Sequence, residues 1–153
     1  MASAKEVAKL RAETGAGVME SKKALQDAGD DYEKAKELIK ERGLAKAAKK
    51  SDREANQGVI EAYVHAGGRI GALVELASET DFVARGQEFK DLARSIAMQV
   101  AAMEPADVDE LLKQDYIKEP GKTIGELVTK LAASTGENVQ VRRIARFELG
   151  KAS

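Results

Sequence analysis

Apolar positions in the first part of the chain, residues 3–43, recur at helical spacing and are interrupted by glycines. Val7 and Leu10 lie three apart, so both fall on one face of a helix. The segment TGAG at 14–17 then ends that helix with residues suited to a cap and to positive φ. The pattern therefore predicts a short first helix followed by a sharp turn.

Two further helices are predicted in the same part of the chain. The second has Leu25 on its inner side and Gly29 as its C-cap. The third begins at Asp30, with Glu33 three residues later as in a capping box, and is expected to end at Gly43. Three short helices bury little apolar surface, so this module needs close packing or a partner to be stable.

Residues 44–57 are polar, basic and rich in alanine, which indicates a helical linker. Its basic residues are Lys46, Lys49, Lys50 and Arg53. They form either a basic patch that contacts phosphates or a solvated connecting face. The lack of interleaved aromatic residues for base stacking favours the solvated face.

From residue 58 the pattern alternates with period two, which is typical of strands with one buried face. Even-numbered positions are apolar in both expected strands: Ile60, Ala62 and Val64 in the first, and Ile70, Ala72, Val74 and Leu76 in the second. A two-residue loop at 67–68 would put these two sets on opposite faces of the sheet. A three-residue loop at 67–69, with a bulge, pairs Ile60 with Leu76 and puts both sets on one face, so we expect the longer loop.

A long helical stripe follows the hairpin. The stripe runs from Phe82 through Phe89 to Met103 and predicts a helix of about 24 residues that ends before Pro105. Ser78, with an acid three residues later, fits a capping box at its start. Two shorter helices are expected next, and a final segment alternates again with period two. Its apolar residues share odd parity: Val139, Val141, Ala145, Phe147 and Leu149.

This order of elements predicts an α+β fold for residues 58–153, with a three-stranded antiparallel sheet and helices packed on one of its faces. The whole chain is then a three-helix module over 1–43, a basic helical linker over 44–57 and this core. The other face of the sheet is either solvated or an interface. Its expected residues are Glu61, Tyr63, His65, Leu73, Glu75, Arg142, Ile144 and Arg146.

The composition gives no reason to expect a strongly charged partner. The 25 lysines and arginines nearly balance 26 acids, and a net charge of -1 provides no general attraction to nucleic acid or to an anionic membrane. The chain has no cysteine, no apolar signal segment near its start and no apolar run of about 18 residues. We therefore expect a cytoplasmic protein without disulfides or membrane spans.

Reactive chemistry is scarce in this sequence. It has one histidine and no cysteine, and it lacks a GxSxG elbow, a P-loop and a GxGxxG fingerprint. Neighbouring acids such as Asp30 and Asp31 fit helix caps better than a catalytic pair. We expect no enzyme activity, no metal and no cofactor, which leaves binding to a partner as the favoured class of function.

Two segments are unusual enough to be binding sites. In TGAGVMESKKAL, Val18 and Met19 follow two glycines, so a partner can approach the backbone closely and the methionine can adapt to it. The other segment is Asp81-Phe82. Phe82 lies seven residues before Phe89, which favours core packing, whereas a ring in the first turn of a helix can instead overhang the sheet edge and contact a partner. The pattern leaves both interpretations of Phe82 open.

Four segments resemble the elongation factor Ts family of translation: LRAETGAGVMESKKAL, YVHAGGRIGALVEL, ETDFVARGQEF and GENVQVRRIARFELG. They occur in the family's order across nearly the whole chain. The resemblance implies an N-terminal three-helix module similar to a ubiquitin-associated domain, followed by a core of sheet and helices. It also implies a guanine-nucleotide exchange factor that binds the GTPase elongation factor Tu and releases its GDP.

The resemblance further implies roles for particular residues. Asp81 and Phe82, with their neighbours Thr80 and Val83, would press against the GTPase beside its magnesium and phosphate site, the aromatic ring lying between helices. His65 matches a histidine that some members present to the GTPase. A second contact, near the partner's nucleotide-binding domain, would use Arg11, Val18, Met19, Lys22 and Lys23.

The chain has one core, whereas long members of the family carry two tandem core halves and a helical hairpin insertion. It resembles the short form, for which a homodimer is expected. Two rival functions remain, a nucleic-acid-binding module and an enzyme acting on a small molecule. The enzyme requires a polar pocket that the sequence does not indicate, and near-neutral charge argues against the nucleic-acid module. That module would use Lys46, Lys49, Lys50, Arg53, Arg142, Arg143 and Arg146.

Overall fold

The computed structural model describes residues 1–151, which form two compact units. The first unit comprises Met1–Asp52 and Thr129–Glu137. The second comprises Arg53–Val128 and the described residues from Asn138 onward. Each unit has its own buried core, and the two are described separately.

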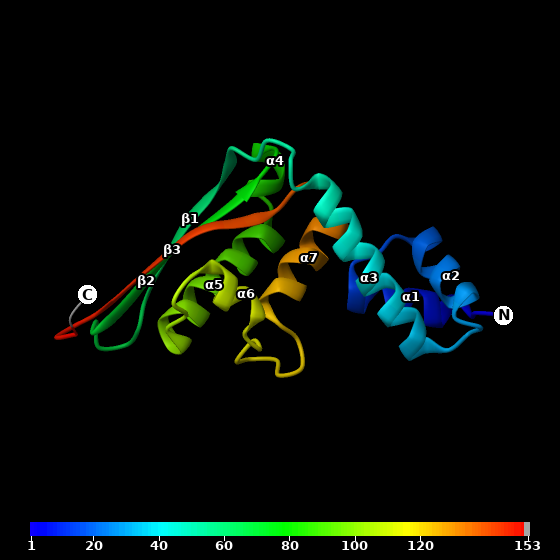
Figure 1. Cartoon of the computed structure of the whole chain (residues 1–153), viewed down its shortest axis with the longest axis horizontal. Coiled ribbons are helices and arrows are strands. Elements are labelled where there is room, and N and C mark those ends of the chain that lie inside the picture. Colours follow the sequence, from blue (N-terminus) through cyan, green and yellow to red (C-terminus); the bar gives the residue numbers. More distant parts are fainter. Residues whose placement is uncertain (152–153) are drawn as a thin grey trace. The chain divides into compact units, whose positions relative to one another are not determined.

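Three helices make up most of the first unit: α1 (Ala4–Thr14), α2 (Val18–Asp27) and α3 (Tyr32–Lys50) (Figure 1). Their buried faces meet in one apolar cluster of Leu10, Ala16, Ala24, Leu25, Ala28, Ala35 and Ile39. Leucine and isoleucine supply the bulk of this small core, and alanines let the helices approach closely. The predicted three-helix arrangement is therefore confirmed.

Both ends of α1 have an identifiable cap. The Ser3 hydroxyl accepts a hydrogen bond from the Glu6 amide (3.2 Å), and the Glu6 carboxylate accepts one from the Ser3 amide (2.9 Å), which completes a capping box. At the other end Gly15 has φ of 76°, and a Cβ there would lie 2.8 Å from the Lys130 carbonyl oxygen. Only glycine satisfies both conditions at this turn.

The third helix differs from the sequence prediction at both ends. Its N-cap is Asp31, whose carboxylate accepts from the Lys34 amide at 3.1 Å, because Asp30 lies in the turn with φ of 63°. Gly43 does not end the helix, which continues to Lys50. A glycine inside a helix costs only about 1 kcal/mol, and the alanine-rich sequence after it favours helix. The expected linker is therefore helical only as far as Lys50, as a continuation of α3.

The second unit contains a three-stranded antiparallel sheet in the order β1-β2-β3. The strands are β1 (Gln57–Val64), β2 (Ile70–Ser78) and β3 (Gln140–Glu148). Its helices are α4 (Asp81–Ala84), α5 (Gln87–Met103), α6 (Val108–Lys113) and the first part of α7 (Ile124–Thr135), whose residues from Thr129 onward belong to the first unit. Figure 1 shows α5 lying along one face of this sheet. The predicted α+β fold class is confirmed.

The core of the second unit lies between α5 and the central strand. Phe89, Ile96 and Val100 of α5, and Val74 and Leu76 of β2, are each 1% exposed or less. Burying side chains of this size contributes about 1.5–3 kcal/mol each. The helix is thereby held against β2.

A buried amide connects α5 to the segment after α6. Gln99 is fully buried, and its Nε2 donates to the Asp115 carbonyl (3.0 Å) while its Oε1 accepts from the Ile117 amide (3.1 Å). A buried amide with satisfied hydrogen bonds costs little, whereas one without partners costs about 1–3 kcal/mol. The pairing fixes the segment that leads to α7.

The register of the hairpin contradicts the sequence prediction. Ile60 pairs with Glu75 and Val59 with Leu76, so even positions of β1 pair with odd positions of β2. Five residues, 65–69, separate the strands, and the Gly68 amide donates to the His65 carbonyl (2.9 Å) within the turn. The apolar even positions of β1 consequently lie on the face away from α5. Val59, Glu61 and Tyr63 take the helix-facing positions and are only half-buried, as befits an edge strand.

The third strand also departs from simple alternation. The register shifts between Glu75 and Leu76, so that Val141 pairs with Leu76 and Arg143 with Glu75, which is a β-bulge. The extra residue reverses the phase of the remainder of β3. Ala145 and Phe147, which were expected to face the core, are exposed instead. The inward positions are taken by the half-buried Ile144 and Arg146.

Together these two changes create an apolar outer face on the sheet, away from α5. We define the outer face by the exposed residues Ile60, Ala62, Val64, Leu73, Ala145 and Phe147. Its four large side chains are 45–75% exposed: Ile60, Val64, Leu73 and Phe147. Of the residues expected on this face from the sequence, Leu73 and Glu75 are present, whereas Glu61, Tyr63, Ile144 and Arg146 lie on the helix side.

Candidate partner-binding site

The predicted long helix is in fact two helices, α4 and α5. Gly86 separates them, with an extended backbone (φ -66°, ψ 147°) that makes it the N-cap of α5. The preceding residue, Arg85, is the C-cap of α4. The break changes the direction of the helix, so the seven-residue spacing from Phe82 to Phe89 no longer places both rings on one face.

The two phenylalanines consequently have opposite environments. Phe89 is 1% exposed in the core, whereas Phe82 is 81% exposed. The core-packing interpretation of Phe82 is therefore wrong. The exposed ring is available for contact with a partner, and burying a side chain of this size there is favourable by about 1.5–3 kcal/mol.

The turn that carries Phe82 is capped by Thr80 rather than by Ser78. The Thr80 hydroxyl accepts from the Val83 amide (3.3 Å), so α4 starts two residues later than the predicted capping box. Ser78 is the last residue of β2 and is fully buried, and its hydroxyl donates to the Thr80 carbonyl (2.9 Å). Ala84, also buried, attaches the inner side of α4 to the core. Thr80 and Asp81 are exposed beside Phe82, and Val83 is half-buried.

Asp81 has a partner at the end of its own helix, the C-cap residue Arg85. Its carboxylate lies 2.8 Å from the Arg85 guanidinium, one turn further on, and both side chains are mostly exposed. An exposed pair of this kind stabilises a helix by only about 0.3–0.5 kcal/mol. The pair restrains the orientation of the carboxylate without burying it. Arg85 was not among the predicted site residues, although its spacing of four from Asp81 is a usable signal in the sequence.

The N-terminal candidates lie in the first unit. Val18 and Met19 occupy the first turn of α2 and are 48% and 72% exposed. Lys22 and Lys23 are exposed one turn later, four residues after Val18 and Met19 respectively, so each pair shares a face of the helix. Lys23 lies 3.5 Å from the Asp27 carboxylate. Arg11, near the end of α1, is exposed.

His65 is separated from the Phe82 turn. It follows the last residue of β1, while α4 begins beyond the opposite end of β2 (Figure 1). The nine residues of β2 are separated by eight steps of about 3.3 Å, which puts roughly 26 Å between these ends. The exposed His65 ring lies 3.1 Å from the Tyr63 hydroxyl through its Nδ1. The structure therefore does not bring His65 and Phe82 into one site.

Many basic residues named for the nucleic-acid alternative already have partners in the structure. Lys46 pairs with Glu20 (2.6 Å), Arg53 with Glu79 (3.5 Å) and Arg143 with Glu75 (3.1 Å). Two more arginines of this set, Arg142 and Arg146, donate to backbone carbonyls. A basic side chain that is already paired with a carboxylate or a backbone carbonyl contributes less to phosphate binding. The arrangement weakens the nucleic-acid alternative.

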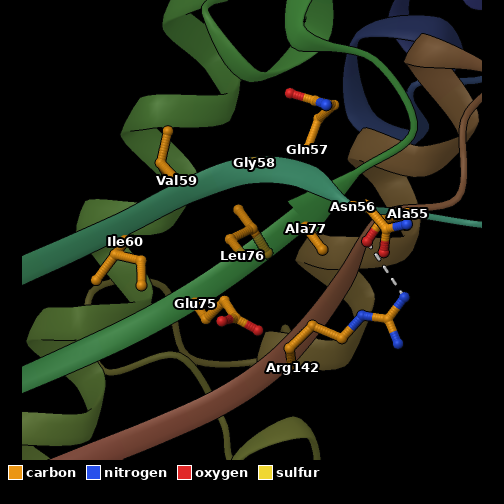
Figure 2. Close-up of a pocket in the computed structure, with 10 residues that line it drawn as sticks. All are labelled: Ala55, Asn56, Gln57, Gly58, Val59, Ile60, Glu75, Leu76, Ala77 and Arg142. Carbon is orange, nitrogen blue, oxygen red and sulfur yellow. Dashed lines mark hydrogen bonds between the residues drawn. The ribbon is translucent and has the colours of Figure 1, made fainter.

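A hollow of about 480 Å³ lies where β1 begins (Figure 2). Its lining residues are Ala55, Asn56, Gln57, Gly58, Val59, Ile60, Glu75, Leu76, Ala77 and Arg142. The Arg142 guanidinium donates to the Ala55 carbonyl (3.3 Å), and Glu75 pairs with Arg143. The charged groups of the hollow are thus engaged with the protein itself. None of the residues predicted to contact the GTPase lines it.

Among residues 1–151, no cluster of three or more histidine, cysteine, aspartate or glutamate side chains could hold a metal ion. None of the helices described is long and apolar enough to cross a membrane.

Comparison with known proteins identifies the family. Residues 79–153, which begin at the Phe82 turn, match the family model described as Elongation factor TS. A protein named Elongation factor Ts from Carboxydothermus hydrogenoformans is 42% identical over 196 aligned positions, covering 99% of this chain and 90% of that protein. The chain belongs to the elongation factor Ts family.

Other members of the elongation factor Ts family match to a similar extent. A relative from Caldanaerobacter subterraneus is 39% identical, with 99% of this chain and 98% of that protein covered. A relative from Rhodomonas salina, named as chloroplastic, is 41% identical, with 97% and 89% covered. These alignments span more positions than the chain has residues, so the relatives carry segments without a counterpart here. Membership of this family assigns the protein to translation elongation.

Proposed function

We propose that this elongation factor Ts family member binds the GTPase elongation factor Tu and promotes release of its GDP. The observation that carries the proposal is the Phe82 ring, 81% exposed on a short capped helix whose inner side is buried. Asp81 and Phe82 press against the GTPase beside its magnesium and phosphate site. The residues Val18, Met19, Lys22, Lys23 and Arg11 provide a second contact.

The proposed activity requires no reactive group in this chain. A factor that binds nucleotide-free GTPase more tightly than the GDP-bound form must, by linkage, weaken GDP binding by the same ratio. The Phe82 ring supplies part of this difference in affinity if the GTPase buries it only when the nucleotide site is distorted. The protein then acts through binding alone, by displacing contacts between the GTPase and its nucleotide.

The ring accounts for a defined share of the effect. Burial of a phenylalanine contributes about 1.5–3 kcal/mol, and each tenfold change in rate corresponds to about 1.4 kcal/mol. One ring therefore accelerates release by about 10- to 100-fold. Further acceleration has to come from other contacts, including those of the first unit.

Release of a fluorescent GDP derivative from elongation factor Tu tests the proposal. The intact protein should accelerate release, and Phe82→Ala should lower the maximal rate by about 10- to 100-fold. A matched control is Ile117→Ala, because Ile117 is also exposed (40%) and lies outside both proposed contacts. Equal rates for Phe82→Ala and Ile117→Ala would contradict the role of the ring. Failure of the intact protein to accelerate release would refute the function.

We also propose that two copies of the chain associate through the outer face of the sheet. Monomeric proteins rarely expose a contiguous apolar patch of this kind, and stacking of two such faces would bury Ile60, Val64, Leu73 and Phe147 of each copy. Sedimentation at micromolar concentration should show a dimer. Phe147→Asp should shift it to monomer, while Ile117→Asp should not. A monomeric intact protein at high micromolar concentration would refute the proposal.

The place of action is proposed to be the cytoplasm, as expected from the cysteine-free sequence. Fractionation of source cells with an antibody against the protein tests this, and enrichment in an organelle would contradict it.

A further inference from the structure

Glu79, the residue directly before Thr80, joins three separate parts of the second unit. Its Oε1 accepts a hydrogen bond from the Asn138 amide at 2.9 Å and lies 3.5 Å from the Arg53 guanidinium. These partners are 59 and 26 residues away in the sequence. A carboxylate that accepts from both a backbone N–H and a guanidinium makes stronger hydrogen bonds than a neutral group.

Asn138 completes the junction from the other side. It is only 4% exposed, and its side-chain amide donates to the Arg53 carbonyl (2.8 Å) while its oxygen accepts from the Gln140 side chain (3.0 Å). The chain before β1, the end of β2 and the start of β3 are thereby connected at one point. We call Arg53, Glu79 and Asn138 the junction.

The helix next to the junction is too short to be stable by itself. α4 has four residues, and a single turn of helix fixes several dihedral angles for very few hydrogen bonds. Its position therefore depends on tertiary anchors. On one side the buried Ser78 hydroxyl donates to the Thr80 carbonyl. On the other side the junction holds Glu79.

We propose that Glu79 is a positioning residue for nucleotide exchange, because the junction holds α4 so that the exposed Phe82 ring is presented in one orientation. The inference rests on the proposed function. An exposed ring can displace part of a partner only if the helix that carries it stays in place during the contact. If α4 were mobile, ordering it on binding would cost free energy. Glu79 itself is only partly exposed, and it acts through α4.

Two substitutions separate the parts of this role. Glu79→Ala removes the acceptor for both the Asn138 amide and the Arg53 guanidinium. Glu79→Gln keeps an oxygen acceptor for the amide and loses the charge opposite Arg53. The matched control is Glu110→Ala in α6, since the Glu110 carboxylate likewise accepts from a backbone amide, that of Ala106, at 3.0 Å. It should cost similar stability and leave α4 undisturbed.

The test measures GDP release from elongation factor Tu over a range of factor concentrations, together with hydrogen exchange at the Val83 amide. Glu79→Ala should lower the maximal rate about tenfold and speed exchange at Val83, while the concentration for half-maximal effect changes less. Glu79→Gln should retain an intermediate rate, and it keeps the test informative if Glu79→Ala does not fold. In a Phe82→Ala background, Glu79→Ala should cause no further loss of rate.

Several outcomes would overturn the inference. One is a maximal rate for Glu79→Ala equal to that of Glu110→Ala, with the intact protein active, which leaves the proposed function standing. Another is a loss that multiplies with that of Phe82→Ala, since the two residues would then act independently. If the intact protein does not accelerate release, the proposed function and this inference fall together.

Discussion

Phe89→Ala should cost far more stability than Phe82→Ala, although both residues belong to one predicted apolar stripe. Phe89 is 1% exposed and packs between α5 and the sheet, so its truncation removes buried contacts and leaves a cavity. Such Phe→Ala changes cost about 3–5 kcal/mol. Phe82 is 81% exposed, so its truncation should change the unfolding free energy by no more than about 0.5 kcal/mol.

Urea unfolding followed by far-UV circular dichroism measures both effects, and tyrosine fluorescence provides a second probe because the chain has no tryptophan. Coincidence of the two probes establishes whether a single transition describes the protein. A loss of about 3–5 kcal/mol is a large part of the total stability of a typical domain, so Phe89→Ala should also melt at least about 10 °C lower.

Equal losses for the two variants would contradict the assignment of Phe82 to the surface and Phe89 to the core. They would mean that Phe82 is buried in solution and that α4 and α5 form the continuous helix indicated by the sequence. A substantial loss for Phe82→Ala alone would refute the assignment of Phe89 to the core.

Three further predictions concern stability. Gly58→Ala should lower the unfolding free energy by more than about 2 kcal/mol, because φ is +142° and the new Cβ would lie 2.1 Å from the Leu76 carbonyl oxygen; an unchanged melting temperature would contradict this. The Arg42 guanidinium lowers the pKa of Asp27, so the pair stabilises the fold above the unfolded pKa and this contribution is lost as pH falls through the folded pKa. Melting temperatures measured from pH 7 down to about 3 should therefore fall at the acid end, and less so for Arg42→Gln. Gln99→Ala should cost about 1–3 kcal/mol by urea unfolding, since it removes the buried partner of two backbone groups, and a cost below about 0.5 kcal/mol would argue against that network.

Local patterns in the sequence determined most of the elements of this protein. The stripes at helical spacing define α1, α2 and α5, and the change to period two at residue 58 marks the sheet. These patterns work because one turn of helix or two residues of strand repeat a direction in space, and burial favours apolar residues in that direction. The family segments, including ETDFVARGQEF, are likewise a property of the sequence alone.

Which face of the sheet the alternating apolar residues of β1 and β3 occupy depends on tertiary structure. Alternation in β1 shows that Ile60 and Val64 share a side of the strand, but the pairing of Ile60 with Glu75 places that side away from α5. The bulge opposite Glu75 then turns Phe147 to the same side. A one-residue difference in register exchanges the two faces of a strand, and the difference is set by turn and bulge geometry rather than by periodicity.

The candidate site shows the same division. The sequence singled out Asp81 and Phe82, and it also placed Phe82 on the stripe of Phe89. Gly86 adopts an extended conformation that separates α4 from α5, and helical spacing does not predict this break. The anchors that hold the resulting turn, such as Asn138 on Glu79, come from residues far apart in the chain. Periodicity describes neighbours within a few residues, so only the folded chain determines which side chain is left exposed and what fixes it in place.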